Sequence, residues 1–120
     1  MSITISQLTK IYGEQKAVNG ISFSVQKGEV VGFLGPNGAG KSTTMKIITG
    51  YLEADAGEVT VCGEKVHTGN LYTKSKTGYL PEANPLYYDM YVREYLEFIA
   101  GVHGIQNKQA AVEKAIDTVK

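Results

Sequence analysis

The sequence has little of what marks secreted, membrane-spanning or nucleic-acid-binding proteins. Its single cysteine, Cys62, argues against a disulfide framework and suits a reducing compartment. Twelve basic residues balance twelve acidic ones, so the net charge gives no sign of a nucleic-acid partner. Its apolar runs, such as VVGFLG, are far shorter than the roughly 18 to 20 residues of a spanning helix. The start, MSITISQLTK, lacks the pattern of a signal peptide, and we predict a cytoplasmic location.

Alternating polar and apolar residues predict strands near the start of the chain. ITISQLTKIYG, which ends at Gly13, and GISFSVQKGE each place apolar side chains on one face, so we predict an antiparallel pair. VVGFLG is apolar at nearly every position, which is typical of a doubly buried central strand of a parallel sheet. GEVTVCGEKV predicts a further short strand, and TGYLPEANP predicts a strand end interrupted by Pro81 and Pro85.

Three other segments have helical spacing. In and just after KSTTMKIITG, the apolar residues Met45, Ile48 and Leu52 lie three and four residues apart, and Gly50 is a stop signal. VREYLEFIAGVHG has an apolar face, and NKQAAVEKAIDTVK begins a further helix with Asn107 as its N-cap. With 42% hydrophobic residues, these elements indicate one ordinary domain with enough apolar side chains for a core.

A glycine-rich loop lies between the predicted buried strand and the first helix. Residues 35–42 match the pattern G-x-x-x-x-G-K-[ST], in which backbone N–H groups surround a phosphate. The two inner glycines leave room for the backbone to wrap an anion, the lysine supplies charge to the β- and γ-phosphates, and the serine hydroxyl suits Mg²⁺. The loop therefore predicts a nucleoside triphosphate site formed by Gly35, Pro36, Asn37, Gly38, Ala39, Gly40, Lys41 and Ser42.

With its flanks, this loop resembles the ATP-binding subunit of ABC transporters. The resemblance extends from LTKIYG through GPNGAGKST, the Walker A motif, to GYLPEANPLYYDMYVREYL. The sequence is most similar to ABC-2-type exporters, particularly gliding-motility-associated and multidrug-like members, which also carry GYLPE. The resemblance implies an α/β fold of the P-loop NTPase type, with a RecA-like core, an antiparallel β element and the start of an α-helical subdomain. We expect the core over residues 1–90 and the truncated subdomain over residues 91–120.

The resemblance also assigns roles to single residues, with ATP and Mg²⁺ as the ligands. Tyr12 matches an aromatic residue that stacks on adenine, worth about 1–3 kcal/mol, although its ring also suits packing on its own hairpin. Thr43 matches a residue whose hydroxyl faces the α-phosphate. Glu82 stands where the family has the Q-loop glutamine, which reaches Mg²⁺ and the attacking water. Glu82 is therefore a candidate catalytic residue, together with Lys41, and a candidate metal ligand, together with Ser42. The alternative is a carboxylate that points into solvent and has no role.

Partners follow from the same resemblance. It implies membrane permease subunits, a second ATPase subunit in a head-to-tail dimer, a place at the inner face of the cell membrane, and no nucleic acid. A cluster of tyrosines follows the GYLPE segment and suits either a groove for the permease or a packed seam between subdomains. The cluster consists of Tyr87, Tyr88, Tyr91 and Tyr95.

Several parts that the family uses to hydrolyse ATP are missing from these 120 residues. No four-residue apolar run ends in Asp-Glu, no Ser-Gly-Gly occurs, and His103 is misplaced for the family's late histidine. We therefore expect the N-terminal half of an ATPase subunit, inactive alone, whose full-length form couples ATP hydrolysis to export. Two alternatives stay open: a soluble ABC-type ATPase of translation or DNA repair, and a non-catalytic nucleotide-binding module.

Overall fold

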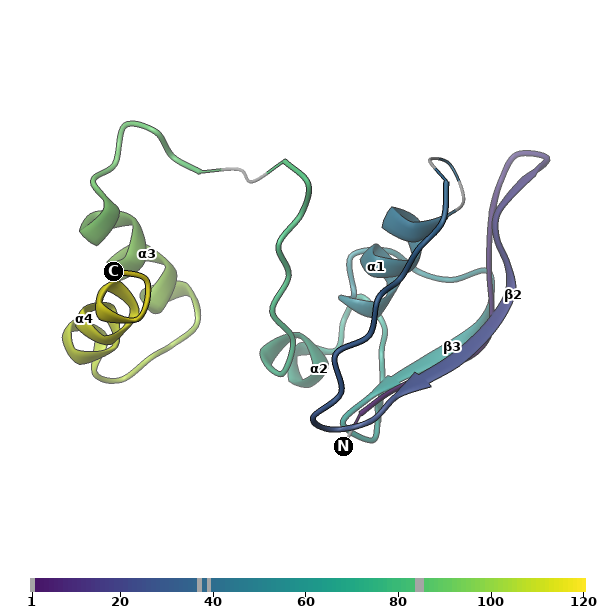
Figure 1. Ribbon diagram of the computed structural model, residues 1–120, viewed down its shortest axis with the longest axis horizontal. Coiled ribbons are helices and arrows are strands. Elements are labelled where there is room, and N and C mark those ends of the chain that lie inside the picture. Colours follow the sequence, from purple (N-terminus) through teal and green to yellow (C-terminus); the bar gives the residue numbers. More distant parts are fainter. Residues whose placement is uncertain (1, 37, 39, 84–85) are drawn as a thin grey trace. The chain divides into compact units, whose positions relative to one another are not determined.

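The computed structural model describes residues 2–36, 38, 40–83 and 86–120 (Figure 1). The chain forms two compact units, Met1–Tyr79 and Leu80–Lys120. The sequence-based boundary at residue 90 stays a prediction. Within the described residues, no helix has both the length and the apolar character needed to cross a membrane.

The first unit is built on a four-stranded antiparallel sheet. Its strands are β1 (Ile3–Tyr12), β2 (Gln15–Val25), β3 (Ala56–Val61) and β4 (Glu64–Lys65), in the order β2-β1-β3-β4. β1 and β2 form the predicted hairpin, in which Tyr12 pairs with Gln15 across a two-residue turn. Gly13 has a φ of 60° in this turn, a conformation that glycine adopts without steric cost. The antiparallel pair expected from the alternating pattern is therefore confirmed.

One face of the sheet is covered by helix α1 (Lys41–Ile48), which ends near Gly50 as predicted (Figure 1). Its Ile47 and Ile48 are buried in the same cluster as Leu8 of β1 and Val59 of β3. Full burial of an aliphatic side chain of this size contributes about 1.5–3 kcal/mol. This cluster fixes α1, and with it the glycine-rich loop that precedes α1, relative to the β1–β2 hairpin. A short helix not foreseen from the sequence, α2 (Leu71–Ser75), follows Asn70, whose side chain caps it.

Two strand predictions are wrong for this structure. The VVGFLG segment has no regular secondary structure, and neither does the segment 77–81. Val30 and Leu34 are 101% and 93% exposed, although the sequence places them in a doubly buried strand. A buried strand needs partners for its backbone groups, and the four strands found among the described residues pair only with one another. The segment instead contributes Phe33, whose ring lies 5.4 Å from that of Phe23 on β2.

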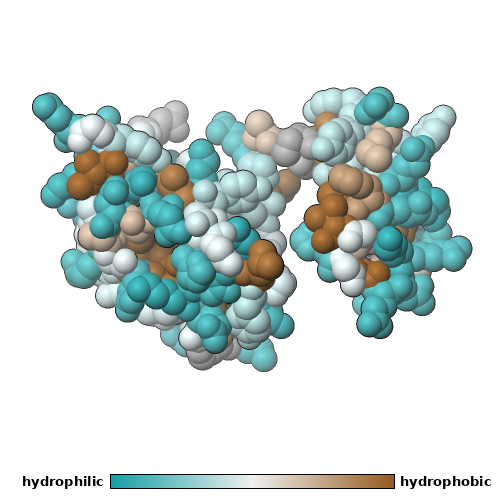
Figure 2. All heavy atoms as spheres, turned by 180° about the vertical axis from the view of Figure 1, so that it is seen from behind, coloured by the Kyte–Doolittle hydropathy of each residue, from teal (hydrophilic) through white to brown (hydrophobic). Residues whose placement is uncertain are grey.

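The second unit contains two helices, α3 (Val92–Val102) and α4 (Lys108–Thr118). The two helices contact each other, and each has one buried side chain, Ala100 on α3 and Val112 on α4. An Arg93–Glu113 ion pair joins their surfaces. Asn107 caps α4 as predicted, because its side-chain oxygen accepts the N–H of Ala110 at 3.2 Å. Both units carry apolar side chains at the surface, shown in brown in Figure 2.

Candidate phosphate-binding site

The glycine-rich loop connects the extended segment after β2 to the first residue of α1. Asn37 and Ala39 lie outside the described residues. Gly38 and Gly40 have φ values of 84° and 91°, in the left-handed region that favours glycine. The loop therefore depends on glycine at both positions, as its sequence pattern predicts.

Gly40 is restricted by packing as well as by its backbone angle. A Cβ atom at this position would lie 2.2 Å from the carbonyl oxygen of Ala17 on β2, far inside van der Waals contact. The carbonyl oxygen of Gly40 accepts both the N–H and the hydroxyl of Thr44, at 2.9 and 2.8 Å. Thr44 is only 1% exposed, and no sequence motif points to it. The absence of a side chain at Gly40 thus allows the start of α1 to pack closely against the hairpin.

The start of α1 presents the groups that suit an anion. The first N–H groups of any helix have no acceptor within the helix, and they carry the positive end of its dipole. Lys41 is half-buried, and its ammonium group donates a hydrogen bond to the carbonyl oxygen of Gly35 at the other end of the loop. The hydroxyl groups of Ser42 and Thr43 follow in the first turn, with Ser42 exposed. This donor set fits a polyphosphate with a hard cation beside it.

A pocket of about 290 Å³ brings this loop together with the hairpin. Tyr12, which is 51% exposed, forms part of its wall. The lining residues that the sequence predicted are Tyr12, Gly38, Gly40, Lys41, Ser42 and Thr43. Gln15 and Ala17 of β2 also line it, and no local sequence signal points to them. Gly35 and Pro36 are exposed loop residues outside the lining, and Glu82 is an exposed residue of the second unit.

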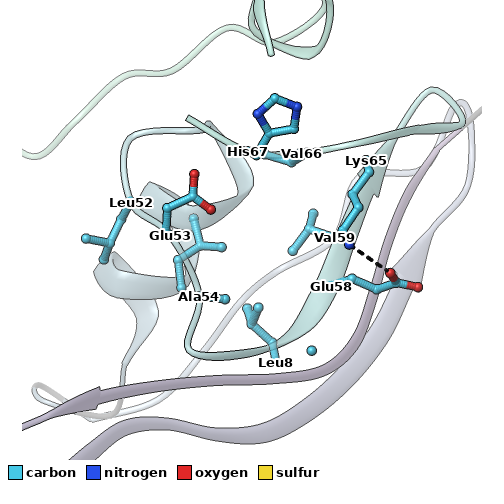
Figure 3. Close-up of a pocket in the computed structure, with 11 residues that line it drawn as sticks. Leu8, Leu52, Glu53, Ala54, Glu58, Val59, Lys65, Val66 and His67 are labelled. Atoms are coloured by element: carbon cyan, nitrogen blue, oxygen red, sulfur yellow. Dashed lines mark ion pairs between the residues drawn. The ribbon is translucent and has the colours of Figure 1, made fainter. Parts of the chain in front are cut away.

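A second pocket of the first unit, of about 360 Å³, has a different lining (Figure 3). Its lining includes Glu53 and His67, together with the exposed ion pair of Lys65 and Glu58, whose charged atoms lie 3.7 Å apart. The N–H of Thr68 donates to Glu53 at 2.6 Å and lowers the pKa of this carboxyl group. Within the described ranges, no group of three His, Cys, Asp or Glu side chains could hold a metal ion.

The tyrosine cluster of the second unit divides into packed and exposed members. The ring of Tyr87 lies 6.2 Å from that of Tyr95 and 5.8 Å from that of Phe98 on α3. Tyr88 and Tyr91 are 90% and 78% exposed. Tyr87 therefore packs against side chains of α3 although it is itself 55% exposed, whereas Tyr88 and Tyr91 are mostly exposed.

Comparisons with known proteins agree with the chemistry of the site. A model of the ABC transporter family matches residues 18–120. The chain is 40% identical over 108 residues to Nod factor export ATP-binding protein I of Burkholderia orbicola (strain AU 1054), covering 90% of this chain and 36% of that protein. It is 41% identical over 103 residues to the linearmycin resistance ATP-binding protein LnrL of Bacillus subtilis (strain 168), covering 86% of this chain and 33% of that protein.

Solved structures show the same fold. A putative ABC transporter ATP-binding protein from Pyrococcus furiosus aligns with a TM-score of 0.79 at 30% identity, over 100% of this chain and 57% of that one. An ATP-binding subunit of an ABC transporter aligns with a TM-score of 0.78 at 31% identity, over 88% and 44%. The chain thus spans 36% or less of the length of the two curated relatives described above.

Proposed function

We propose that the phosphate loop binds ATP with Mg²⁺, because this chain belongs to the ABC transporter family of ATP-binding proteins. The pocket formed by the loop, the start of α1 and Tyr12 is the observation that carries this proposal. It joins a cradle of backbone donors to an aromatic ring, the two features that a triphosphate and a nucleobase require.

Each group of the pocket has a separate part in the proposed binding. The N–H groups of the loop and of the first turn of α1 hold the phosphate oxygens. Lys41, which donates to the carbonyl oxygen of Gly35 here, would instead contact the β- and γ-phosphates. Ser42 would hold Mg²⁺, whose charge offsets that of the phosphates. Thr43 and Tyr12 line the same pocket, in which the Thr43 hydroxyl would face the α-phosphate and the Tyr12 ring would stack on the base.

In the whole protein, we propose that ATP hydrolysis drives export through a separate membrane permease. The two relatives named above are called a Nod factor export protein and a linearmycin resistance protein, which supports an export role. The exposed Tyr88 and Tyr91 are the proposed contact for the permease, because tyrosine is enriched at interfaces. A second ATP-binding subunit and a place at the inner face of the membrane belong to the same proposal.

Glu82 is proposed as a ligand on the Mg²⁺ side of the nucleotide. A carboxylate attracts Mg²⁺ and repels phosphate, at about 1 kcal/mol per charge pair at 4 Å in water, so the two effects oppose each other. Glu82→Gln in the full protein should therefore retain turnover within about tenfold, or about 1.4 kcal/mol. Glu82→Ala should lose sensitivity to Mg²⁺ concentration. If Glu82→Ala matches the wild type across a Mg²⁺ titration, with and without the permease, the residue has neither role.

The proposed function is tested by ligand binding and by co-purification. The full protein should bind ATP in calorimetry, should bind it more tightly with Mg²⁺, and should lose it to competing inorganic triphosphate. Co-purification with a membrane protein would support the exporter role over a soluble ABC-type ATPase. Absence of ATP binding, or binding that inorganic triphosphate does not displace, would contradict the assignment of the phosphate loop.

A further inference from the structure

Asp55 makes two contacts with the end of β1 that carries Tyr12. Its backbone N–H donates to the carbonyl oxygen of Thr9 at 2.9 Å, and its carboxylate oxygen Oδ2 accepts the N–H of Ile11 at 2.6 Å. Strand β3 pairs with β1 only as far as Thr9, which lies opposite Ala56. The carboxylate of Asp55 therefore takes the place of a further strand residue on that side of β1.

The same carboxylate also holds a lysine against the Tyr12 ring. Lys10 Nζ lies 3.7 Å from Asp55 Oδ2, and the Lys10 side chain is only 15% exposed. The ammonium group lies 5.6 Å from the centre of the Tyr12 ring, within the range of a cation–π contact. Lys10 and Tyr12 are two residues apart on a strand, so their side chains share a face. Asp55 thus restrains both the backbone beside Tyr12 and the cation that contacts its ring.

Apart from its contacts with Asp55, the end of the hairpin is a two-stranded element. Beyond Thr9, the pairing of β1 continues only with β2, through Ile11 opposite Lys16 and Tyr12 opposite Gln15. An isolated two-stranded hairpin is marginally stable in water. A charge-assisted hydrogen bond at 2.6 Å is a strong restraint at this point of the chain.

We propose that Asp55 is a positioning residue for the nucleobase: it holds Tyr12 at the wall of the phosphate-loop pocket through Ile11 and Lys10. This inference rests on the proposed function and adds a residue that is absent from the pocket lining. The phosphate donors of the loop and α1 lie on other segments of the chain. The effect of Asp55 therefore falls on ligands that carry a base and leaves binding of the bare polyphosphate intact.

The test compares ATP with inorganic triphosphate, both with Mg²⁺, in calorimetry on the full protein. Asp55→Ala should weaken ATP binding about tenfold, within the range of a lost base–aromatic stack, and should leave triphosphate affinity within about twofold. Asp55→Asn should lose less, because its side-chain oxygen still accepts the Ile11 N–H while the charge beside Lys10 is gone. Glu58→Gln is the matched control, because Glu58 forms an exposed ion pair of the same length, 3.7 Å, away from Tyr12.

Three results would overturn the inference. Equal losses for ATP and triphosphate in the Asp55 variants would mean a general structural role, and unchanged ATP binding would mean no role. A loss as large in Glu58→Gln as in Asp55→Ala would mean a nonspecific charge effect. Thermal unfolding of each variant checks that it is folded. If Asp55→Ala does not fold, the comparison of ATP with triphosphate is made on Asp55→Asn. A wild-type protein that binds neither ligand would be a failure of the proposed function itself.

Discussion

Two pockets of the first unit differ in size and in the chemistry they present. The larger, of about 360 Å³, has the carboxylates of Glu53 and Glu58 beside Lys65 and His67. The smaller, of about 290 Å³, has Lys41 as the one charged residue among the described residues that line it. A carboxylate repels each phosphate charge by about 1 kcal/mol at 4 Å in water, and more in a drier site. The charge and the backbone donors of the smaller pocket, rather than its volume, therefore distinguish it as the proposed triphosphate site.

The largest expected effect comes from the cation of the smaller pocket. Lys41→Ala in the full protein should lower ATP affinity by about a hundredfold or more, or about 3 kcal/mol, because charged hydrogen bonds to phosphate are lost. Hydrolysis should be abolished, because the developing charge on the γ-phosphate is no longer stabilised. Lys46→Ala, which changes an exposed lysine in the last turn of the same helix, should behave as wild type in calorimetry and phosphate-release assays. Wild-type turnover in Lys41→Ala would mean that the charge of Lys41 does not mark the smaller pocket as the triphosphate site.

Gly40→Ala should destabilise the fold around the smaller pocket. The added Cβ would meet the Ala17 carbonyl at 2.2 Å, and the residue would also have to adopt a φ of 91°. Backbone strain of this kind costs on the order of 1–3 kcal/mol before the steric clash is added. Gly38→Ala is the matched comparison, because its φ of 84° is similar but its Cβ would have no neighbour within 4 Å. Denaturant unfolding should show a clearly larger loss for Gly40→Ala, and equal losses would mean that the contact with β2 is unimportant.

Tyr12→Ala should have a smaller effect, confined to ligand binding. The loss of base stacking should weaken ATP binding by about 1–3 kcal/mol, whereas Tyr12→Phe keeps the ring and should lose much less. The side chain is 51% exposed, so we expect little change in the free energy of unfolding. Equal losses in the two variants, measured by calorimetry, would assign the contribution to the hydroxyl group instead of the ring.

The sequence predicts those parts of the site that depend on local pattern. The hairpin follows from the alternation of polar and apolar residues, and the loop follows from its glycine spacing. Outside the site, the cap of α4 follows in the same way from Asn107. The contact of Gly40 with Ala17 and that of Asp55 with Ile11 join residues far apart in the chain, and no local pattern encodes them. Thr44 lies next to the recognised motif, but its burial depends on the packing of α1 against the sheet.

The failed strand prediction for VVGFLG has a related cause. Apolar residues at nearly every position indicate that a segment favours burial on both faces. They do not indicate whether strands are available to pair with it, and Val30 and Leu34 are exposed here. An apolar run therefore predicts that a segment favours burial. Whether the segment forms a strand also depends on a second segment that can pair with it.

The smallest effect is expected in the larger pocket, from Glu53→Gln. The N–H of Thr68 lowers the pKa of Glu53 in the folded protein below its ordinary value of about 4.5. A carboxyl group with a lowered folded-state pKa contributes stability above its unfolded-state pKa, and that stability is lost as pH falls through the folded-state value. Because Glu53 is exposed, the wild type should exceed the variant by no more than about 0.5 kcal/mol at neutral pH.

This difference should disappear when denaturant unfolding is repeated at a pH below the folded-state pKa, where the wild-type carboxyl group is also neutral. A difference that persists at low pH would mean that packing, not charge, is responsible. ATP affinity should be unchanged in Glu53→Gln, because the carboxylate lines a pocket other than the one proposed for the triphosphate. If Glu53→Gln instead altered ATP affinity as much as Tyr12→Ala, the nucleotide would have to reach both pockets, and charge would no longer separate them.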